Sequence, residues 1–288
     1  MNVARHPEEL PTADRAVALG SFDGVHVGHR RVLETARAAG LRTTVVTFWP
    51  HPRIVLGNRV ELLTTLDRRL ELLAETGMDE ALVVEFTSEL ARLDPREFAE
   101  SLLDRIGARV IAVGENFRFG HGASGTPALL DELGFDVHQV PLLEGASSTR
   151  IRQLLQAGEV EGAAKLFGRP VEVEGVVVLG HQRGGTLGYP TANLDVSADV
   201  IVPAYGIYVG SALAHRAAVS IGVNPHYGGS ERRIEPYLLD FEGDLYGKRL
   251  IVELWQRLRD ERAFGSEEEL VAQMAADVEA ARLAQRPV

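Results

Sequence analysis

The sequence predicts two domains: an α/β domain with a parallel sheet over residues 1–168, and an antiparallel β-barrel with a terminal helix over residues 169–288. Three observations support this prediction. In the first part, strand-like runs alternate with helical patterns of crossover length, which is typical of parallel sheets. After Gly168-Arg169-Pro170 the runs become short and β-like, and glycine and proline clusters separate them. The length of 288 residues suits two domains of ordinary size.

The elements of the first domain follow from β-branched or apolar runs and from helical spacing. Strands are predicted at residues 16–19, 43–48, 81–86, 109–113 and 137–140. Helices are predicted at residues 29–39, 65–76, 95–106 and 128–133. Asp94 is the expected N-cap of the third helix. Because ligands of parallel sheets bind beyond the carboxyl ends of the strands, the turns at Gly20 and Gly114 are expected at that edge.

In the second domain, no helix of crossover length separates the β-like runs, which favours antiparallel pairing. The predicted strands are residues 171–179, 207–209, 217–221, 236–241 and 250–254. A helix is predicted over residues 266–284, where Ser266 and Glu269 can form a capping box and an apolar stripe follows at helical spacing.

The composition of the chain argues against several classes of binding partner. The chain has 41 acidic and 30 basic residues and a formal net charge of -11, which argues against a broad nucleic-acid-binding face. It has no cysteine, which excludes disulfides and thiolate metal sites and fits a cytoplasmic location. Residues 1–10 lack the apolar core of a signal peptide, and no apolar run is long enough to span a bilayer, so no membrane partner is expected. A weak homo-oligomer is the protein partner left open.

Residues 20–29, Gly-Ser-Phe-Asp-Gly-Val-His-Val-Gly-His, are the first motif that indicates chemistry. Glycines allow a tight turn, and a helix N-terminus offers N–H groups to phosphate. His26 and His29 could both face one phosphate and stabilise the charge that develops during transfer. Two other readings stay open: a glycine turn with two surface histidines, and a metal site completed by Asp23 and His51.

Two further segments carry phosphate-type or metal-type ligands. Hydroxyls of Ser147, Ser148 and Thr149 at a helix start, with Arg152, suit phosphate oxygens, although the same residues fit an N-cap and a solvated face. The segment 188–194 carries Thr191 and Asn193, whose oxygens suit Mg²⁺. By itself this segment equally fits a turn with an asparagine bonded to its own backbone.

The composite pattern resembles the bacterial bifunctional riboflavin kinase/FMN adenylyltransferase family, often called FAD synthetases. The first domain resembles the nucleotidyltransferase (Rossmann-like) half of that family in the segments 20–29, 48–52, 63–66, 114–120 and 147–152. The second resembles the riboflavin kinase half in the segments 180–194, 234–240, 244–248 and 264–266. The resemblance extends from about Val17 to Arg282.

This resemblance implies roles for individual residues. The implied catalytic residues are His26, His29, Asn116 in the flavin-side loop, and Glu235 as the general base of the kinase. The implied ATP-binding residues are Gly20, Ser21, Phe22, Asp23, Gly28, Ser147, Ser148, Thr149, Arg152, Gly188 and Pro190. Thr191 and Asn193 would hold Mg²⁺.

The implied activity is phosphorylation of riboflavin to FMN by ATP, followed by adenylylation of FMN to FAD with release of pyrophosphate. Riboflavin, FMN and ATP would therefore be the small-molecule partners. A chain with one surviving activity and a non-catalytic flavin-binding regulator remain the alternatives. Two segments depart from the family pattern, residues 181–185 and 224–228, the second with His226 where threonine is expected. The stretch between Gly125 and Ser147 is also shorter than usual.

Overall fold

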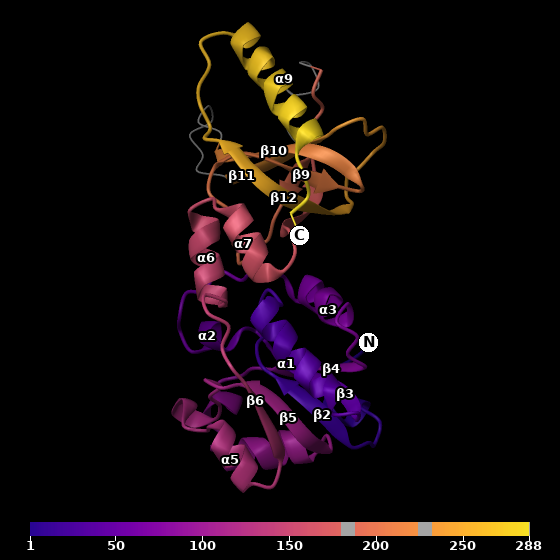
Figure 1. Ribbon diagram of the computed structural model, residues 1–288, viewed down its shortest axis with the longest axis vertical. Coiled ribbons are helices and arrows are strands. Elements are labelled where there is room, and N and C mark those ends of the chain that lie inside the picture. Colours follow the sequence, from indigo (N-terminus) through magenta and orange to yellow (C-terminus); the bar gives the residue numbers. More distant parts are fainter. Residues whose placement is uncertain (180–187, 224–231, 288) are drawn as a thin grey trace. The chain divides into compact units, whose positions relative to one another are not determined.

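The computed structural model describes residues 1–179, 188–223 and 232–287. The chain divides into two compact units, Met1–Ser148 and Thr149–Val288 (Figure 1). The sequence segments that depart from the family pattern, 181–185 and 224–228, lie outside the described residues. None of the helices in the described ranges is long and apolar enough to cross a membrane.

The first unit is built on a six-stranded parallel sheet in the order β1-β4-β3-β2-β5-β6. Its strands are β1 (Asn2–Ala4), β2 (Arg15–Leu19), β3 (Arg42–Trp49), β4 (Glu80–Glu85), β5 (Ala108–Gly114) and β6 (Asp136–Val140). Its α-helices are α1 (Val27–Ala38), α2 (Pro52–Val55), α3 (Leu66–Ala74), α4 (Pro95–Phe98) and α5 (Pro127–Glu132). The short elements are the 3-10 turns η1 (Pro7–Glu9), η2 (Leu90–Arg92) and η4 (His121–Ala123), and the π-helix η3 (Ala99–Asp104).

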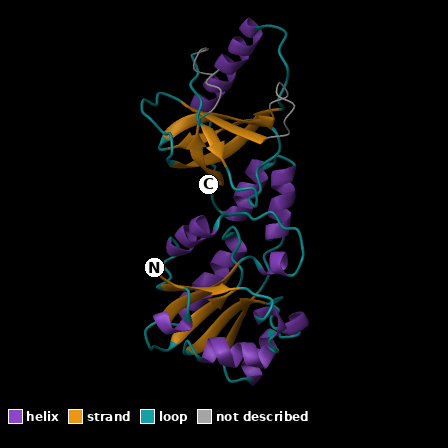
Figure 2. Cartoon of the chain, turned by 180° about the vertical axis from the view of Figure 1, so that it is seen from behind, coloured by secondary structure: helices purple, strands orange, loops and turns teal. Residues whose placement is uncertain are grey.

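Alternate residues of the strands pack against opposite faces of this sheet. Val17 and Leu19 belong to a core with residues of α4, η3 and α5, whereas Ala16 and Ala18 belong to a core with residues of α1 and α3. Figure 2 shows helices on both sides of the strands of this unit. The first unit is therefore a three-layer α/β/α domain, as the sequence predicts.

The strand order places a topological switch point between β2 and β5. From β2 the chain continues to β3 and β4 on one side, and it later returns to β5 and β6 on the other side. Because β2 and β5 are parallel neighbours, their carboxyl ends share an edge. Ligands of such sheets bind at this crevice. The turn at Gly20 follows β2 and the turn at Gly114 ends β5, so both lie at the expected edge.

The second unit begins with two helices and continues as an antiparallel sheet. The helices are α6 (Ser148–Gln156), whose first residue still belongs to the first unit, α7 (Val160–Phe167) and the C-terminal α9 (Glu267–Leu283). The strands are β7 (Val171–Val178), β8 (Asn193–Asp195), β9 (Gly206–Ala212), β10 (His215–Val223), β11 (Arg232–Leu238) and β12 (Arg249–Arg259). Their order is β11-β10-β9-β12-β7-β8, and every pair is antiparallel.

The two outer strands of this sheet approach each other, which gives it the form of a barrel. Ala192, just before β8, donates its N–H to the carbonyl of Pro236 in β11 at 2.9 Å. The antiparallel β-barrel with a terminal helix, predicted from the sequence, is confirmed. The strand predicted at 236–241 is wrong in its end, because β11 stops at Leu238 and Asp240 has a left-handed φ of 56°.

Helix ends agree with the sequence in part. Asp94 caps α4 in a full capping box. Ser266 caps α9, but Glu269 accepts from Gly265 rather than from Ser266, so the reciprocal bond is shifted by one residue. Gly168, in a left-handed conformation at φ 68°, ends α7 just where the sequence pattern changes. The compact units divide at Ser148 and Thr149, so the domain boundary at 168/169 stays a prediction.

Candidate active sites

The turn between β2 and α1 has an unusual backbone. Phe22 and Val25 have left-handed φ angles of 50° and 41°, and Gly24 has φ 84°. Left-handed conformations are uncommon outside glycine, and they are least favourable for β-branched residues such as valine. Such conformations persist only where surrounding contacts determine them, and they cluster at functional sites.

The two histidines of this turn lie in contact at the start of α1. His26 is the N-cap, and its Nδ1 accepts from the N–H of His29 at 3.3 Å. The rings are stacked, with centroids 3.6 Å apart and planes 17° from parallel. Gly28 leaves room for the pair, because a Cβ there would lie 3.1 Å from the His26 ring, a tight contact. The spacing of the motif therefore produces one compact imidazole pair.

The environment keeps His29 neutral. Burial, then the nearby His26 and then the Arg69 cation lower the pKa of His29 well below its ordinary value of 6.5. At neutral pH the ring can therefore act as an N–H donor but not as a fixed cation. Among the described residues its buried Nδ1 has no hydrogen-bond partner. The pair can thus offer donors to a charged group at the switch point.

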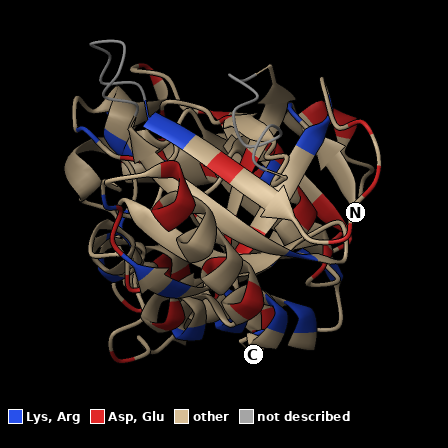
Figure 3. Cartoon of the chain, turned by 90° about the horizontal axis from the view of Figure 1, so that it is seen from above, with Lys and Arg blue, Asp and Glu red and all other residues tan. Residues whose placement is uncertain are grey.

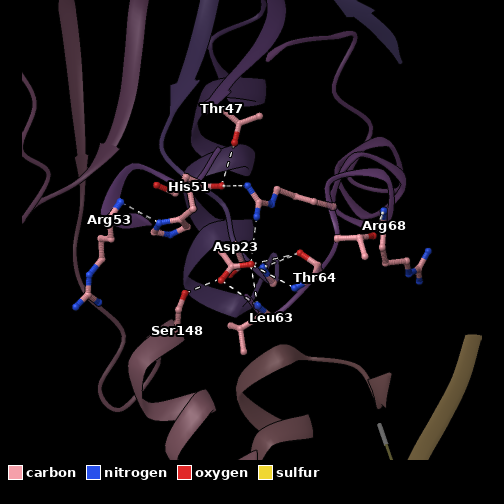
Figure 4. Close-up of polar contacts among 12 residues, drawn as sticks. Asp23, Thr47, His51, Arg53, Leu63, Thr64, Arg68 and Ser148 are labelled. Atoms are coloured by element: carbon pink, nitrogen blue, oxygen red, sulfur yellow. Dashed lines mark hydrogen bonds and ion pairs between the residues drawn. The ribbon is translucent and has the colours of Figure 1, made fainter. Parts of the chain in front are cut away.

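Asp23 faces into the protein. Its carboxylate accepts from the backbone of Leu63 at 3.0 Å and Thr64 at 3.3 Å, and it lies 3.3 Å from the guanidinium of Arg69 (Figure 4). Its side chain is 2% exposed. These contacts give the carboxylate a structural role, and the ATP-binding role of Asp23 stays a prediction.

The alternative of a metal site in this turn gains no support. His51 is the N-cap of α2, and its Nδ1 accepts from the backbone of Arg53 at 3.2 Å. Asp23 is engaged with Leu63 and Thr64. Within the described ranges, no group of three or more histidines and carboxylates has a metal-binding arrangement.

A hydrogen bond joins the second predicted phosphate segment to the turn. Ser148 donates from Oγ to the backbone carbonyl of Asp23 at 3.2 Å. Ser147 is the exposed residue before it, while Thr149 and Arg152 follow in α6 and belong to the second unit. Asn116 is exposed in the turn after β5, on the same edge of the sheet. The structure thus brings the turn, Ser148 and the Asn116 loop to one edge of the first unit.

In the second unit, the predicted kinase residues lie on neighbouring segments. Thr191 and Asn193 flank Ala192, whose N–H is bonded to Pro236, the residue after Glu235. Tyr189 also contacts Tyr237 ring to ring, with centroids 5.4 Å apart. Gly188, with φ 84°, and Pro190 lie in the same segment. Backbone pairing therefore places the segment that carries Thr191 and Asn193 beside the strand that carries Glu235.

Glu235 lies on the more exposed face of β11. Ile234, Pro236 and Leu238 are buried, whereas Glu235 is 32% exposed at its side chain and 4.0 Å from Arg233. Tyr237 shares its face, as alternation predicts. Leu239, expected on that face as well, is buried beyond the end of the strand.

A second carboxylate acts on Glu235. The Oε1 of Glu261 occupies the space above Gly222, where a Cβ would lie 1.8 Å from it. Burial, and after it the charge of Glu235, raise the pKa of Glu261. Glu261 was not predicted as a site residue, because it follows β12 in the sequence and shows no motif of its own.

Two other residues of the first site were missed by sequence reasoning. Arg69 is fully buried in α3, and Thr64 is 5% exposed just before that helix. A signal was present for Arg69, since it lies three residues after Leu66 and four before Leu73, on the buried stripe of the helix. A charge on such a stripe indicates a buried partner.

Comparison with known proteins agrees with this division into two sites. A family model described as FAD synthetase matches residues 9–152, and one described as riboflavin kinase matches residues 167–284. Proteins named bifunctional riboflavin kinase/FMN adenylyltransferase are similar along nearly the whole chain. The one from Listeria monocytogenes is 34% identical, covering 94% of each chain, and the one from Escherichia coli is 35% identical, covering 95% of this chain and 94% of its own.

A solved structure has the same architecture. The crystal structure described as a macrolide-efflux protein from Streptococcus pneumoniae has a TM-score of 0.89 and 33% identity, and it covers 98% of this chain and 99% of that one. Fold, paired sites and similarity along the full length lead to one assignment: the chain belongs to the bifunctional riboflavin kinase/FMN adenylyltransferase family.

Proposed function

We propose that this chain makes FAD from riboflavin in two steps, one in each unit. In the second unit, the ribityl 5′-hydroxyl of riboflavin attacks the γ-phosphorus of ATP, which gives FMN and ADP. In the first unit, an FMN phosphate oxygen attacks the α-phosphorus of a second ATP, which gives FAD and pyrophosphate. The observation that carries the proposal is that a separate family match, to FAD synthetase or to riboflavin kinase, accompanies each of the two candidate sites.

The first step needs a base and neutralised phosphate charge. Glu235 accepts the hydroxyl proton, which a positioned carboxylate can do during attack. Thr191 and Asn193 supply oxygen ligands of the kind that Mg²⁺ prefers, and their half-buried positions beside β11 fit such a site. Bound there with ATP, Mg²⁺ would neutralise phosphate charge. Gly188 and Pro190 shape the segment that approaches the nucleotide.

The second step needs charge stabilisation and in-line positioning. His29, whose ring is neutral, and His26 donate to the phosphate oxygens of ATP as charge develops on them. The backbone of Gly20, Ser21, Phe22 and Gly28 forms the surface against which the nucleotide lies. Free N–H groups at the start of α1 add a favourable dipole for the phosphates.

The hydroxyl-rich segment and the flavin-side loop carry the remaining residues predicted for the adenylylation step. Ser147, Ser148, Thr149 and Arg152 hold phosphate oxygens through hydroxyls and a guanidinium. Asn116, exposed at the same edge of the sheet, contacts the FMN that attacks.

One incubation tests both steps. The purified chain is mixed with riboflavin, ATP and Mg²⁺, and the flavins are separated by chromatography over time. We expect FMN to form first and FAD to follow, with neither formed when EDTA replaces free Mg²⁺. FMN alone would indicate a single surviving activity, and tight flavin binding without turnover would indicate a regulator.

Charge and composition support the proposals on partners and location. In the view of Figure 3, acidic and basic residues are interspersed along the described chain, which supports the prediction that nucleic acid is no partner. The absence of cysteine supports a cytoplasmic location. A weak homo-oligomer is tested by sedimentation over a range of protein concentrations.

A further inference from the structure

A buried ion pair lies against the turn that carries the histidines. The guanidinium of Arg69 is 3.3 Å from the carboxylate of Asp23, and the two side chains are 0% and 2% exposed. Arg69 also donates from Nη1 to the backbone carbonyl of Ser21 at 3.1 Å. One side chain of α3 is therefore bonded to both neighbours of Phe22, the first left-handed residue of the turn.

Two threonines strengthen this connection. Thr64 accepts at Oγ1 from the N–H of Gly24 at 3.3 Å, and Thr47 donates to the carbonyl of Ser21 at 3.0 Å. Figure 4 shows Thr47, Thr64 and Leu63 arranged around Asp23 and the turn. Contacts from β3, from α3 and from the segment before α3 thus hold a backbone that would not adopt these φ angles unaided.

The ion pair acts on His29 in two ways, through the ring of Phe22 and through the charge of Arg69. Phe22, held between Ser21 and Asp23, makes an edge contact with the ring of His29 at a centroid distance of 5.3 Å. The Arg69 charge also acts on His29 directly and lowers the pKa of that ring, as does His26. The charged or titratable groups acting on His29 are therefore His26 at the helix start and Arg69 from α3, with Asp23 paired to Arg69.

We propose that Arg69 and Asp23 are positioning residues of the adenylyltransferase site, which hold the turn in the conformation that stacks His29 on His26. In this role Asp23 supports ATP binding by holding the turn in place, and its carboxylate does not contact the nucleotide. This inference rests on the proposed formation of FAD in the first unit. It assigns to Asp23 a role different from the ATP contact that the sequence predicts.

The test uses the full chain and four variants. Arg69→Met removes the charge and the hydrogen bonds at similar length, Arg69→Lys keeps the charge, and Asp23→Asn keeps the shape. Arg68→Met is the matched control, because Arg68 directly precedes Arg69 on α3 and pairs instead with Glu71 and Glu75 at 2.9 and 3.5 Å. Figure 4 shows Arg68 directed away from Asp23.

Two readouts separate positioning from general stability. We expect Arg69→Met and Asp23→Asn to lower kcat for FAD formation from FMN by about 10²-fold, the cost of misplaced groups, with less change in KM for ATP. Riboflavin phosphorylation should stay at the parent rate and report that the chain is folded. By NMR titration, the His29 ring should titrate at higher pH in Arg69→Met, because a neighbouring cation is gone. Arg69→Lys should restore the titration and part of kcat.

Two results would contradict the positioning role of Arg69 and Asp23. FAD formation within about threefold of the parent in both Arg69→Met and Asp23→Asn, a margin well inside that 10²-fold cost, overturns the proposal. So does a fall that is matched by an equal loss of kinase activity. If Arg69→Met does not fold, Asp23→Asn and Arg69→Lys still decide. A parent chain that makes no FAD would instead refute the proposed function, and the His29 titration would still test the ion pair.

Discussion

At the scale of single residues, the surroundings of a side chain decide its chemistry as much as its type does. The sequence predicts that His26 and His29 act together, and the stacked rings confirm their proximity. It does not predict that His29 is neutral, because the lowered pKa depends on burial and on Arg69, 40 residues further along the chain. Likewise the sequence does not predict that the carboxylate of Asp23 contacts Leu63, Thr64 and Arg69, and its ATP-binding role stays a prediction.

His29→Ala tests the role of the imidazole pair. We expect FMN adenylylation to fall by about 10²- to 10³-fold, the loss usual for a preorganised donor. Chromatography of FAD made from supplied FMN measures this change. Riboflavin phosphorylation in the same sample is the control and should persist. FAD formation at the parent rate would remove His29 from the mechanism.

Glu235→Gln tests the base of the kinase. The substitution keeps size but removes proton acceptance, so riboflavin phosphorylation should fall by about 10²- to 10⁴-fold. ATP binding, measured by calorimetry, and FMN adenylylation should change little. If phosphorylation is normal, the base is another group. Asp240 is then a poor substitute, because Arg282 binds it at 2.8 and 3.0 Å, and Glu261 becomes the next choice.

At the scale of elements, the sequence predicts those with a strong period or a strong cap. The central strands β2, β3, β4 and β5 are found because their runs are apolar or β-branched. Edge strand β1 is missed, because three residues at a polar terminus show no period. The helix predicted over 95–106 changes to a π-helix after Phe98. Residues of this π-helix belong to the core on one face of the sheet, and local helix propensity does not predict such a change.

A cluster of buried charges connects the amino ends of strands β2, β3 and β4. Glu80 of β4 is fully buried and binds Arg15 of β2 at 3.0 Å, Arg42 at 2.6 Å and Thr44 at 3.0 Å. We expect Glu80→Gln to lower the free energy of unfolding of the first unit by about 3–5 kcal/mol, because it leaves Arg15 buried without its carboxylate. Urea denaturation measures this.

The matched control for Glu80 is Asp14, whose pair with Arg109 is exposed. Asp14→Asn should change the free energy of unfolding by about 0–1 kcal/mol. Equal effects of the two substitutions would show that burial does not set the strength of the Glu80 cluster.

The attachment of α9 to the barrel should depend on pH. Hydrogen bonds from Arg282 hold the pKa of Asp240 below its ordinary value. Burial raises the pKa of Glu253, but bonds from Arg286, Trp255 and Ser211 outweigh this and leave it lowered. Both pairs therefore stabilise the fold above the unfolded pKa values of about 4, and this stability is lost as pH falls through the lower folded values.

Hydrogen exchange measures this dependence. Amide protection in α9, once corrected for the intrinsic rate, should fall as the pH is lowered below the unfolded pKa values of about 4. In the double variant Arg282→Gln and Arg286→Gln, protection should already be low at pH 7 and should change less with pH. A pH dependence equal to that of the parent would show that other groups anchor the helix.

At the scale of the whole molecule, the question is where the kinase unit begins. The family matches end at 152 and resume at 167, and the compact units divide at Ser148. The sequence predicts a boundary at Gly168, because the β-like pattern starts there. Helix patterns before it look alike whichever unit they pack on, so the sequence alone does not assign α6 and α7. Ala204 donates to the carbonyl of Leu155 in α6 at 2.9 Å, a contact that favours a start of the kinase unit before α6 ends.

Two fragments decide between these boundaries. One begins at Thr149 and keeps nearly all of α6 and all of α7, and the other begins at Arg169 and lacks both. Phe167 is 3% exposed, and its burial alone contributes about 1.5–3 kcal/mol. We therefore expect the Thr149 fragment to melt at a higher temperature and to convert riboflavin to FMN at the rate of the full chain. The Arg169 fragment should unfold more easily or aggregate. Neither should make FAD, because both lack His26 and His29.

Two outcomes would contradict this expectation. Equal melting temperatures and equal kinase rates of the two fragments would favour the boundary at 168/169. Two inactive fragments beside an active full chain would show that the kinase unit depends on the first unit.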